Sequence, residues 1–173
     1  MRYVTKQLHC GDTLLKSLDS EIQEVSRTLN EHPWSPTFSF ETPNTTVQHQ
    51  TAYNRSFSSS LYDAGWKLQP RLSESPRLIG DFAKGLVFGE IQFGNSSTLY
   101  RDYYKFQYGL QNGLLSLAIL IVPHNEYEFF PTRGESVRNM ANFTLAHRYF
   151  EVLPISVPTI IYGLLADEEN VTM

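Results

Sequence analysis

Apolar residues recur at helical spacing after Asp12, which is placed as an N-cap, and Pro33 lies beyond the end of the pattern. The repeated positions, which share one face of a helix, are Leu14, Leu15, Leu18, Ile22, Val25 and Leu29. This stretch predicts a first helix that packs one face against a core.

The polar segment from Ser35 to Gln50 has little periodicity and is rich in Thr, Ser, Pro, Asn and Gln. This composition predicts a surface loop or a short hairpin. A second, shorter helix is expected from about Ala52 to Tyr62. Gly65 follows it as part of a flexible stop before Trp66.

Two short extended runs follow Pro76, from Arg77 to Ala83 and from Leu86 to Phe93. Lys84 and Gly85 separate the two runs, as in a β-hairpin. We therefore predict two paired strands in this part of the chain.

A third helix is predicted from Thr98 to Asn112, because apolar positions again share one face and Gly113 lies just past the end. Leu115 to Val122 follows as a nearly unbroken apolar run, which is typical of a strand buried on both faces. We expect this run to be the central strand of the sheet.

The last expected elements are a helix around Ser136 to Tyr149 and an apolar strand from Val157 to Leu164. The third helix connects the hairpin to the central strand. It is expected to cross over one face of a mixed sheet and to cover that face. The fold class is therefore α/β, with a central mixed β-sheet flanked by helices.

Length and composition agree with one folded domain over residues 1–173, since 41% of the residues are hydrophobic and 18% are charged. Cys10 is the only cysteine, which excludes an intramolecular disulfide and a multi-cysteine zinc site. Met1 to Cys10 has no apolar stretch long enough for a signal peptide, so a cytoplasmic location is expected.

The formal net charge of -4 argues mildly against broad, nonspecific binding to nucleic acid. Acidic residues gather at 21–24 and in the tail 167–169. Basic residues near the middle of the chain leave a local basic cleft open; they are Lys67, Arg71, Arg77, Lys84, Arg101 and Lys105. An acidic total also suits a nuclease whose metal-binding carboxylates repel DNA until a divalent cation neutralises them.

Asp81 and Glu90 lie on adjacent arms of the predicted hairpin, so their side chains can converge at one end of the sheet. Mg²⁺ prefers oxygen ligands and usually takes one or two carboxylates together with waters and a substrate phosphate. With the backbone carbonyl of Ile91, these carboxylates could hold an ion that polarises a scissile phosphate and activates a water. The chemistry indicated is hydrolysis of a phosphodiester.

Gln92 follows Glu90 on the same face of the strand, because side chains alternate along a strand. Its amide can hydrogen-bond an attacking water or a phosphate oxygen, but it cannot act as a base or a cation. An Asp followed by Glu-x-Gln is common by chance, and the simpler interpretation is a pair of solvated carboxylates beside a surface amide.

Longer segments of the sequence are more specific evidence for a family than these three residues. Residues 90–95 (Glu-Ile-Gln-Phe-Gly-Asn), 100–106 and 114–123 resemble the catalytic core of BglII and BstYI-type restriction endonucleases. A helix that ends in Gly-Trp-Lys at 65–67 and a strand over 153–163 are similar to that family as well. Residues 124–151 are not matched.

The resemblance implies a PD-(D/E)xK restriction-endonuclease-like core in which glutamine stands at the usual lysine position. It implies catalysis by Asp81, Glu90 and Gln92. It also implies that Mg²⁺ is bound by Asp81, Glu90 and the backbone carbonyl of Ile91, and that Gln92 positions the attacking water.

Asn95 matches a polar position beside the DNA in that family, and we extend the expectation of DNA binding to Ser96 and Ser97. These residues could instead cap the third helix, and capping is the preferred interpretation for Ser97. The same helix N-terminus could also hold a phosphate.

Arg101 and Lys105, one turn apart on the third helix, could contact DNA phosphates or pair with nearby carboxylates. Arg133 and Arg138 could read guanine through bidentate contacts, although solvated loop arginines are commoner. The aromatic residues of the third helix fit core packing better than base stacking. Glu24 on the first helix fits a solvated face better than a metal ligand.

The function expected is Mg²⁺-dependent hydrolysis of double-stranded DNA by a type II site-specific endonuclease. The target would be a short palindrome matched by the two-fold axis of a homodimer. By analogy with the family, the target would contain GATC and the host would carry a matching methyltransferase. A structure-specific or repair nuclease and a catalytically silent DNA-binding protein of the same fold are the alternatives.

Overall fold

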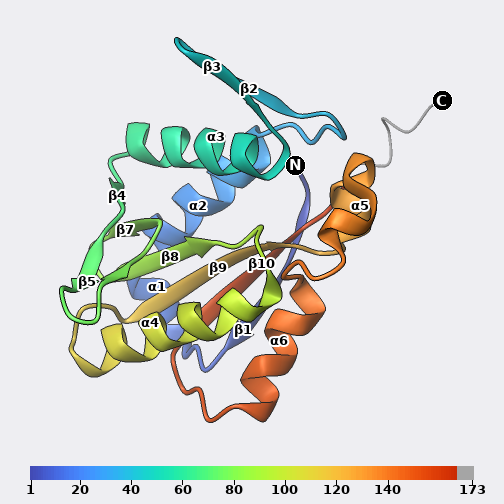
Figure 1. Ribbon diagram of the computed structural model, residues 1–173. Coiled ribbons are helices and arrows are strands. Elements are labelled where there is room, and N and C mark those ends of the chain that lie inside the picture. The colour runs from blue at the N-terminus through green and yellow to red at the C-terminus, as the bar shows by residue number, and fades with distance from the viewer. Residues whose placement is uncertain (167–173) are drawn as a thin grey trace.

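The computed structural model describes residues 1–166, and the acidic tail residues 167–169 lie outside this part. Its central sheet contains β1 (Tyr3–Leu8), β4 (Lys67–Leu68), β7 (Phe82–Lys84), β8 (Val87–Ile91), β9 (Leu117–Pro123) and β10 (Thr159–Leu164). The order across the sheet is β1-β10-β9-β8-β7-β4 (Figure 1). β8, β9 and β10 run parallel, and the other neighbours are antiparallel. The predicted mixed sheet is confirmed.

Helices cover both faces of this sheet (Figure 1). α2 (Asp19–Glu31) and α3 (His49–Asp63) pack on one face, and α4 (Leu99–Gln111) and α6 (Phe143–Val152) pack on the other. Each pair of helices shares a hydrophobic core with the strands beneath it. The predicted α/β class, with helices flanking the sheet, is therefore also confirmed.

The predicted central strand is β9, which has a parallel neighbour on each side. Its alternating side chains divide between the cores: Leu117, Ile119 and Ile121 pack toward α2 and α3, and Ala118, Leu120 and Val122 pack toward α4 and α6. Every residue of β9 is buried, because a strand between two helical layers has no face toward solvent.

The predicted first helix is two helices, α1 (Asp12–Ser17) and α2. The chain leaves helical geometry at Leu18, where φ is -116° and ψ is 18°. The apolar residues Val25 and Leu29 of α2 are buried, whereas α1 buries no residue completely. The break therefore lets α2 turn its apolar stripe onto the sheet while α1 stays at the surface.

The edge strand β1 was not predicted. Its residues are half-buried or exposed, because only one of its edges is paired and few of its side chains meet a core. Such a strand needs no apolar run, so the sequence around Thr5 and Gln7 gives little signal.

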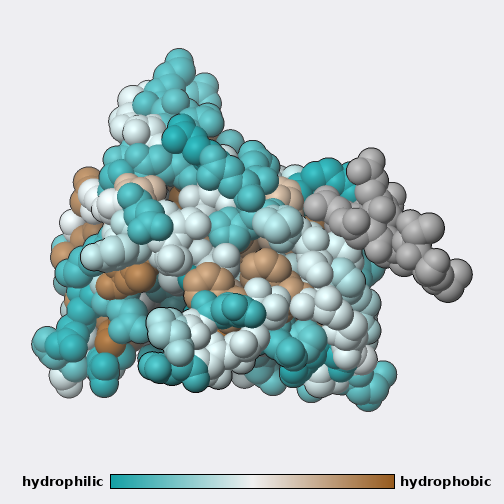
Figure 2. Space-filling model, turned by 90° about the horizontal axis from the view of Figure 1, so that it is seen from above, coloured by the Kyte–Doolittle hydropathy of each residue, from teal (hydrophilic) through white to brown (hydrophobic). Residues whose placement is uncertain are grey.

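The polar segment before α3 forms the hairpin of β2 (Ser39–Thr42) and β3 (Thr45–Gln48), as one of the two expectations had it. The hairpin projects from the body of the molecule beside α3 (Figure 1), and from above it is a hydrophilic projection (Figure 2). α3 begins at His49, slightly before the predicted start at Ala52.

The predicted strand from Arg77 to Ala83 is divided. β6 (Leu78–Ile79) pairs with β5 (Arg71–Ser73) in a small separate sheet, and β7 begins only at Phe82. The chain changes sheets at Gly80, where a Cβ atom would lie 2.1 Å from Cζ of Phe88. Only glycine fits at this crossing without displacing Phe88, and the next residue is Asp81.

The late helix begins after its predicted start. Residues Glu126–Phe129 form the short α5, Pro131–Val137 form a 3-10 segment, and α6 follows only at Phe143. The side chain of Asn142 accepts a hydrogen bond from the backbone N–H of Leu145 and so caps α6. No helix within residues 1–166 is both long and apolar enough to cross a membrane.

Candidate active site

Asp81 and Glu90 lie side by side on neighbouring strands. Phe82 pairs with Gly89, and the backbone N–H of Asp81 donates to the carbonyl of Gly89 at 3.1 Å, which places Asp81 opposite Glu90. The carboxylate of Asp81 accepts a hydrogen bond from the N–H of Ile91 at 2.7 Å. The hairpin therefore brings both predicted carboxylates to one end of β8.

Gln92 follows β8 directly, and its backbone N–H donates to the carbonyl of Ile121 at 2.8 Å. Its side-chain Nε2 donates to Oδ2 of Asp102 at 2.7 Å, and its Oε1 accepts from the N–H of Gly94 at 2.9 Å. The amide is thus held in one orientation toward α4, on the same side of the sheet as Glu90.

Lys105 is the cation of this cluster. Its Nζ lies 2.6 Å from Oε1 of Glu90 and 2.9 Å from Oδ1 of Asp102, and it donates to the carbonyl of Ile79 at 3.2 Å. Lys105 is only 4% exposed, so the predicted contact with DNA phosphate is wrong. The alternative interpretation, pairing with nearby carboxylates, is confirmed, because α4 turns this residue into the sheet rather than toward solvent.

Asp102 was missed in the sequence. It is 2% exposed and bridges two site residues, since one carboxylate oxygen contacts Lys105 and the other accepts from Gln92. A signal for it exists: Asp102 shares a helix face with Leu99 and Phe106, and a carboxylate that interrupts an apolar face needs a buried partner.

The site holds more negative charge than it neutralises. Burial raises the pKa of Glu90 well above 4.5, and repulsion from Asp81 and Asp102 raises this pKa further while Lys105 opposes the rise. Burial also raises the pKa of Asp81, against the hydrogen bond from Ile91 and the charge of Lys105. A divalent cation between Asp81 and Glu90 would favour both ionised forms.

The donor atoms suit Mg²⁺, which takes oxygen ligands. Within residues 1–166 no three His, Cys, Asp or Glu side chains are placed together to hold a metal ion. An ion held by Asp81 and Glu90 would therefore take its other ligands from a backbone carbonyl, water and substrate. This is the ligand set that the sequence predicts, with Ile91 as the source of the carbonyl.

Glu24 belongs to a different cluster, in contact with the hairpin rather than with the candidate metal ligands. It accepts a hydrogen bond from Nε1 of Trp66 at 2.8 Å and pairs with Lys84 at 2.7 Å. The interpretation of Glu24 as part of a solvated face is wrong, because its side chain is 22% exposed and satisfied by these two partners.

The residues after Gln92 contact part of the segment 124–151, for which the sequence showed no family resemblance. The N–H of Ser96 donates to the carbonyl of Asn139 at 2.7 Å, and Asn95 forms a β-bridge with Met140. A pocket of about 220 Å³ lies at this junction, lined by Gln50, Phe93, Gly94, Asn95, Glu135, Ser136, Asn139 and Met140.

The cap before α4 is Asn95 rather than Ser97. Oδ1 of Asn95 accepts a hydrogen bond from the N–H of Ser97 at 2.9 Å and so caps the 3-10 turn Ser96–Thr98 that leads into α4. The expectation that Ser97 caps the helix is wrong, because its side chain makes no cap and its backbone is the donor.

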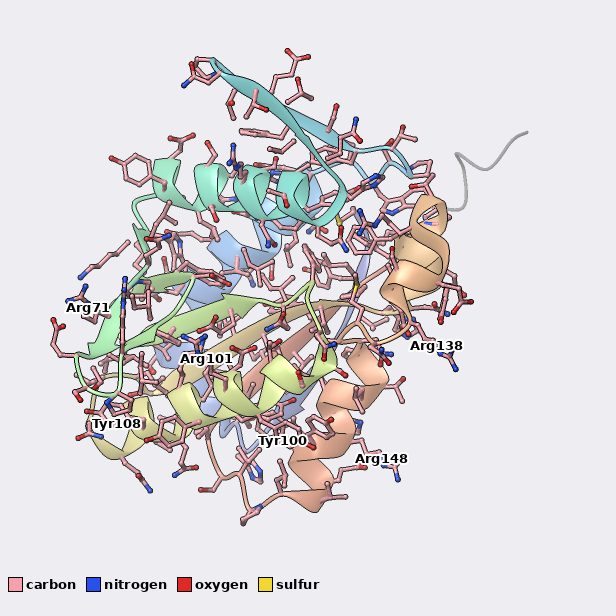
Figure 3. The ribbon with its side chains drawn as sticks, in the orientation of Figure 1. Arg71, Tyr100, Arg101, Tyr108, Arg138 and Arg148 are labelled. Carbon is pink, nitrogen blue, oxygen red and sulfur yellow. The ribbon has the colours of Figure 1, made fainter. Side chains whose placement is uncertain are left out.

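Of the three arginines predicted to contact DNA, Arg101 and Arg138 are exposed and Arg133 is half-buried. Arg101 on α4 and Arg138 after the 3-10 segment are labelled in Figure 3 and lie well apart in that view. Nε of Arg133 donates to Ser136 at 3.1 Å, and Arg138 lies 3.9 Å from Glu135. These contacts are local and leave the arginine side chains accessible.

The predicted basic cleft loses several of its members to ion pairs. Arg71 pairs with Glu74, Lys84 with Glu24, and Lys105 with Glu90 and Asp102. Arg101 is exposed and has no ion pair or hydrogen bond to the residues that the structure describes. The members of the predicted cleft that stay exposed without an ion pair among residues 1–166 are therefore Lys67, Arg77 and Arg101.

The aromatic residues of α4 divide between core and surface. Tyr103 and Phe106 are buried in the core, as predicted. Tyr100 is 53% exposed and Tyr104 is 52% exposed, so the expectation of core packing is wrong for these two. Tyr100 stacks on Tyr149 of α6, with the ring centroids 4.8 Å apart.

The chain is similar to two solved structures of one restriction endonuclease. The crystal structure of BglII complexed with a DNA 16-mer matches with a TM-score of 0.77 and 17% identity, covering 96% of this chain and 79% of that chain. The crystal structure of free BglII matches with a TM-score of 0.57 and 20% identity, covering 96% and 81%. These similarities show the fold, and the chain superposes better on the DNA-bound form.

The sequence itself matches a family model described as "Restriction endonuclease BglII/BglIII" over residues 3–164. A comparison with curated proteins finds no significant match. The matched range extends from the first strand of the sheet to the last and includes the hairpin of Asp81 and Glu90. The chain therefore belongs to the BglII/BglIII family of restriction endonucleases, which makes it a type II site-specific deoxyribonuclease.

Proposed function

We propose that this endonuclease hydrolyses phosphodiester bonds of double-stranded DNA with Mg²⁺ bound by Asp81, Glu90 and the backbone carbonyl of Ile91. The observation that carries the proposal is the pair of buried carboxylates at the end of β8, whose pKa values are raised by burial and which are held in place by other groups. Buried carboxylates with raised pKa values are typical of sites that bind a cation or perform catalysis.

A bound Mg²⁺ would polarise the scissile phosphate and lower the pKa of the attacking water. The residues of the chain supply the geometry. The N–H of Ile91 fixes Asp81, and Lys105 fixes one oxygen of Glu90. Gln92 positions the water or a phosphate oxygen by hydrogen bonding and accepts no proton, because an amide is not a base at neutral pH.

Lys105 and Asp102 support these groups from α4. Their contacts tie Glu90 and Gln92 to one helix, so the two residues keep a fixed relation to each other. Partners that orient the ligands of a metal typically change metal affinity or activity by about 10- to 100-fold when they are removed. We therefore assign Lys105 and Asp102 as positioning residues.

We propose that Asn95, Ser96, Ser97, Arg101, Arg133 and Arg138 contact the DNA. The structural relative was crystallised with a DNA 16-mer, and this chain superposes on that form with the higher TM-score. Glu135, Ser136 and Asn139 line the pocket beside Asn95, and Arg133 and Arg138 are their close neighbours in the chain, which supports the proposal. Arg138 is exposed and Arg133 is half-buried, and arginine side chains can form bidentate contacts with guanine.

A short palindromic target requires two active sites related by a two-fold axis, and we propose a homodimer. α4 and α6 lie side by side on one face of the sheet. Tyr100 and Tyr104 on α4 and Val152 on α6 are each more than half exposed, at 53%, 52% and 66%. Large exposed apolar residues that lie near one another indicate an interaction surface.

The proposal is tested by incubating the purified protein with methylation-free phage DNA in Mg²⁺ or EDTA, followed by electrophoresis and sequencing of the ends. Discrete fragments that require Mg²⁺ are expected, and Asp81→Asn and Glu90→Gln should each lower cleavage by orders of magnitude. A smear would instead indicate a structure-guided nuclease. Tight duplex binding without cleavage would indicate a silent DNA-binding protein.

In a host that uses this enzyme for restriction, the genome must be protected at the same site. We therefore propose a cytoplasmic location and a companion methyltransferase that modifies the target. The protection is tested by treating phage DNA with an extract of the host before incubation with the endonuclease, which should abolish the fragments.

A further inference from the structure

A groove of about 740 Å³ runs along α3 and ends at Asp81. One wall is α3 itself, and the remaining lining comes from β2 and from the chain around β4. The lining residues are Phe40, Thr51, Asn54, Arg55, Ser58, Ser59, Tyr62, Leu68, Gln69 and Asp81. The groove therefore connects a long helical surface to one of the two proposed metal ligands.

The wall of the groove is a polar stripe on α3. Ala52, Tyr53, Phe57 and Leu61 of this helix are buried toward the core. The groove residues of the helix, at positions 51, 54, 55, 58, 59 and 62, follow one another at spacings that place them on a common side of a helix. α3 thus presents short hydroxyl and amide side chains to the groove while its apolar residues hold it on the sheet.

The groove offers one free cation and unused hydrogen-bonding groups within residues 1–166. Among residues 1–166, Asp81 is the one carboxylate that lines it, and Asp81 is itself a proposed ligand of the cation. Arg55 is exposed and has no hydrogen bond or ion pair with any residue from 1 to 166. Oδ1 of Asn54 is buried and also lacks a partner within that range. Hydrogen-bonding capacity is therefore left unused along the route to the active site.

We propose that this groove binds the sugar-phosphate backbone of the strand whose scissile phosphate lies at Asp81, with Arg55 in contact with a phosphate. Arginine, Ser, Thr, Asn, Gln and Tyr are the side chains that usually contact the DNA backbone, and the lining contains each of these types. Contacts to phosphate and sugar carry no sequence information directly, so the groove positions the strand rather than selecting the target.

The inference rests on the proposed DNA cleavage and adds a second wall to the DNA site. The residues proposed to read the target follow β8 and lie beside the pocket at Asn95, whereas α3 precedes β8 in the chain and lies on the opposite face of the sheet from α4. The DNA backbone would then be held by the groove along α3, and the bases would be read by residues near Asn95, beside a pocket that Gln50 at the start of α3 also lines.

The test measures binding to a short duplex, with Ca²⁺ in place of Mg²⁺, for the parent protein, Arg55→Gln and Arg27→Gln. Arg27 is an exposed arginine on the neighbouring α2 and serves as the matched control. Arg55→Gln should weaken binding roughly tenfold, which is the typical effect of losing a hydrogen bond to a charged group. The slope of log affinity against log salt should decrease in magnitude by about one, which corresponds to the loss of one phosphate contact.

The loss should be the same for the target duplex and for an unrelated duplex, since a backbone contact is independent of sequence. A second variant, Ser59→Glu, places a negative charge in the groove and should weaken binding more than Gln23→Glu on α2. Thermal melting of each variant checks that the fold is kept.

The outcomes separate the two proposals. If Arg55→Gln and Ser59→Glu both bind DNA as tightly as the parent protein, the groove proposal is overturned and the cleavage proposal stays intact. A loss confined to the target duplex also overturns the groove, because it would show base reading. A parent protein that neither binds nor cuts duplex DNA overturns both.

Discussion

At the scale of single residues, the candidate site depends on a buried network of unlike charges. Glu90, Asp102 and Lys105 are each at most 4% exposed, and among residues 1–166 Lys105 is the cation in direct contact with the two carboxylates. Removing one partner of a buried ion pair leaves an uncompensated charge in a medium that solvates it poorly.

Lys105→Met should therefore lower the free energy of unfolding by about 3 to 5 kcal/mol, and cleavage should fall with it. Urea denaturation measures the change. The control is Lys84→Met, which removes a cation from a pair that is more exposed and should cost less.

The double variant Lys105→Met with Glu90→Gln should be more stable than Lys105→Met alone, because it removes the charge that was left unpaired. A double variant whose loss is the sum of the two single losses would show that Lys105 and Glu90 do not interact.

The carboxylates also predict a pH dependence. Glu90 and Asp81 bind protons more tightly in the folded chain than in the unfolded chain, because burial raises their pKa values. In EDTA, the free energy of unfolding should consequently fall as the pH rises from the ordinary range of these groups to the raised pKa of Glu90.

Glu90→Gln should flatten this fall, and saturating Mg²⁺ should oppose it by favouring the ionised carboxylates. Urea denaturation from about pH 4 to pH 8 measures both effects. An unchanged slope in Glu90→Gln would assign the titration to other groups.

At the scale of elements, sequence patterns predicted the helices and strands that pack on a core, and they missed features that do not depend on core packing. β9 and β10 are largely apolar runs, and α4 has a recurring apolar face that only Asp102 and Lys105 interrupt with charge, so their patterns were informative. The edge strand β1 and the break at Leu18 are set by partners that are distant in sequence, and no local pattern marks them.

The candidate site shows the same division. The adjacency of Asp81 and Glu90 follows from a local hairpin and could be predicted. The roles of Asp102 and Lys105 depend on how α4 is rotated against β8, which only the packed structure reveals.

The crossing at Gly80 connects an element boundary to the position of Asp81. Gly80→Ala should cost about 1 to 3 kcal/mol of stability, because a Cβ atom would overlap the ring of Phe88. Cleavage should fall as well, since Asp81 is the next residue. Gly11→Ala is the control, because a Cβ atom at Gly11 meets nothing within 4 Å; equal melting temperatures for the two variants would contradict the prediction.

At the scale of the whole molecule, cleavage of both strands of a palindrome requires two copies of the chain. If α4 and α6 form the interface, Tyr104→Lys should weaken dimerisation at least tenfold, because a charge would be placed in an apolar contact. Analytical ultracentrifugation measures the association.

The control for this variant is Tyr127→Lys on α5, which alters another exposed tyrosine outside the proposed interface. Monomers in the parent protein at micromolar concentration, or an unchanged dimer in Tyr104→Lys, would place the two-fold axis elsewhere or remove it.

The position of β10 in the sheet has a consequence for how the protein is made. β10 pairs with β1 on one side and with β9 on the other, so the first strand to be synthesised has no partner until the last one is complete. A ribosome that stops before Thr159 releases a chain in which β1 and one edge of β9 are unpaired and both hydrophobic cores lack the residues of β10. Products that stop before β10 should then be degraded rather than cut the chromosome, and nuclease activity should appear only after β10 has been made.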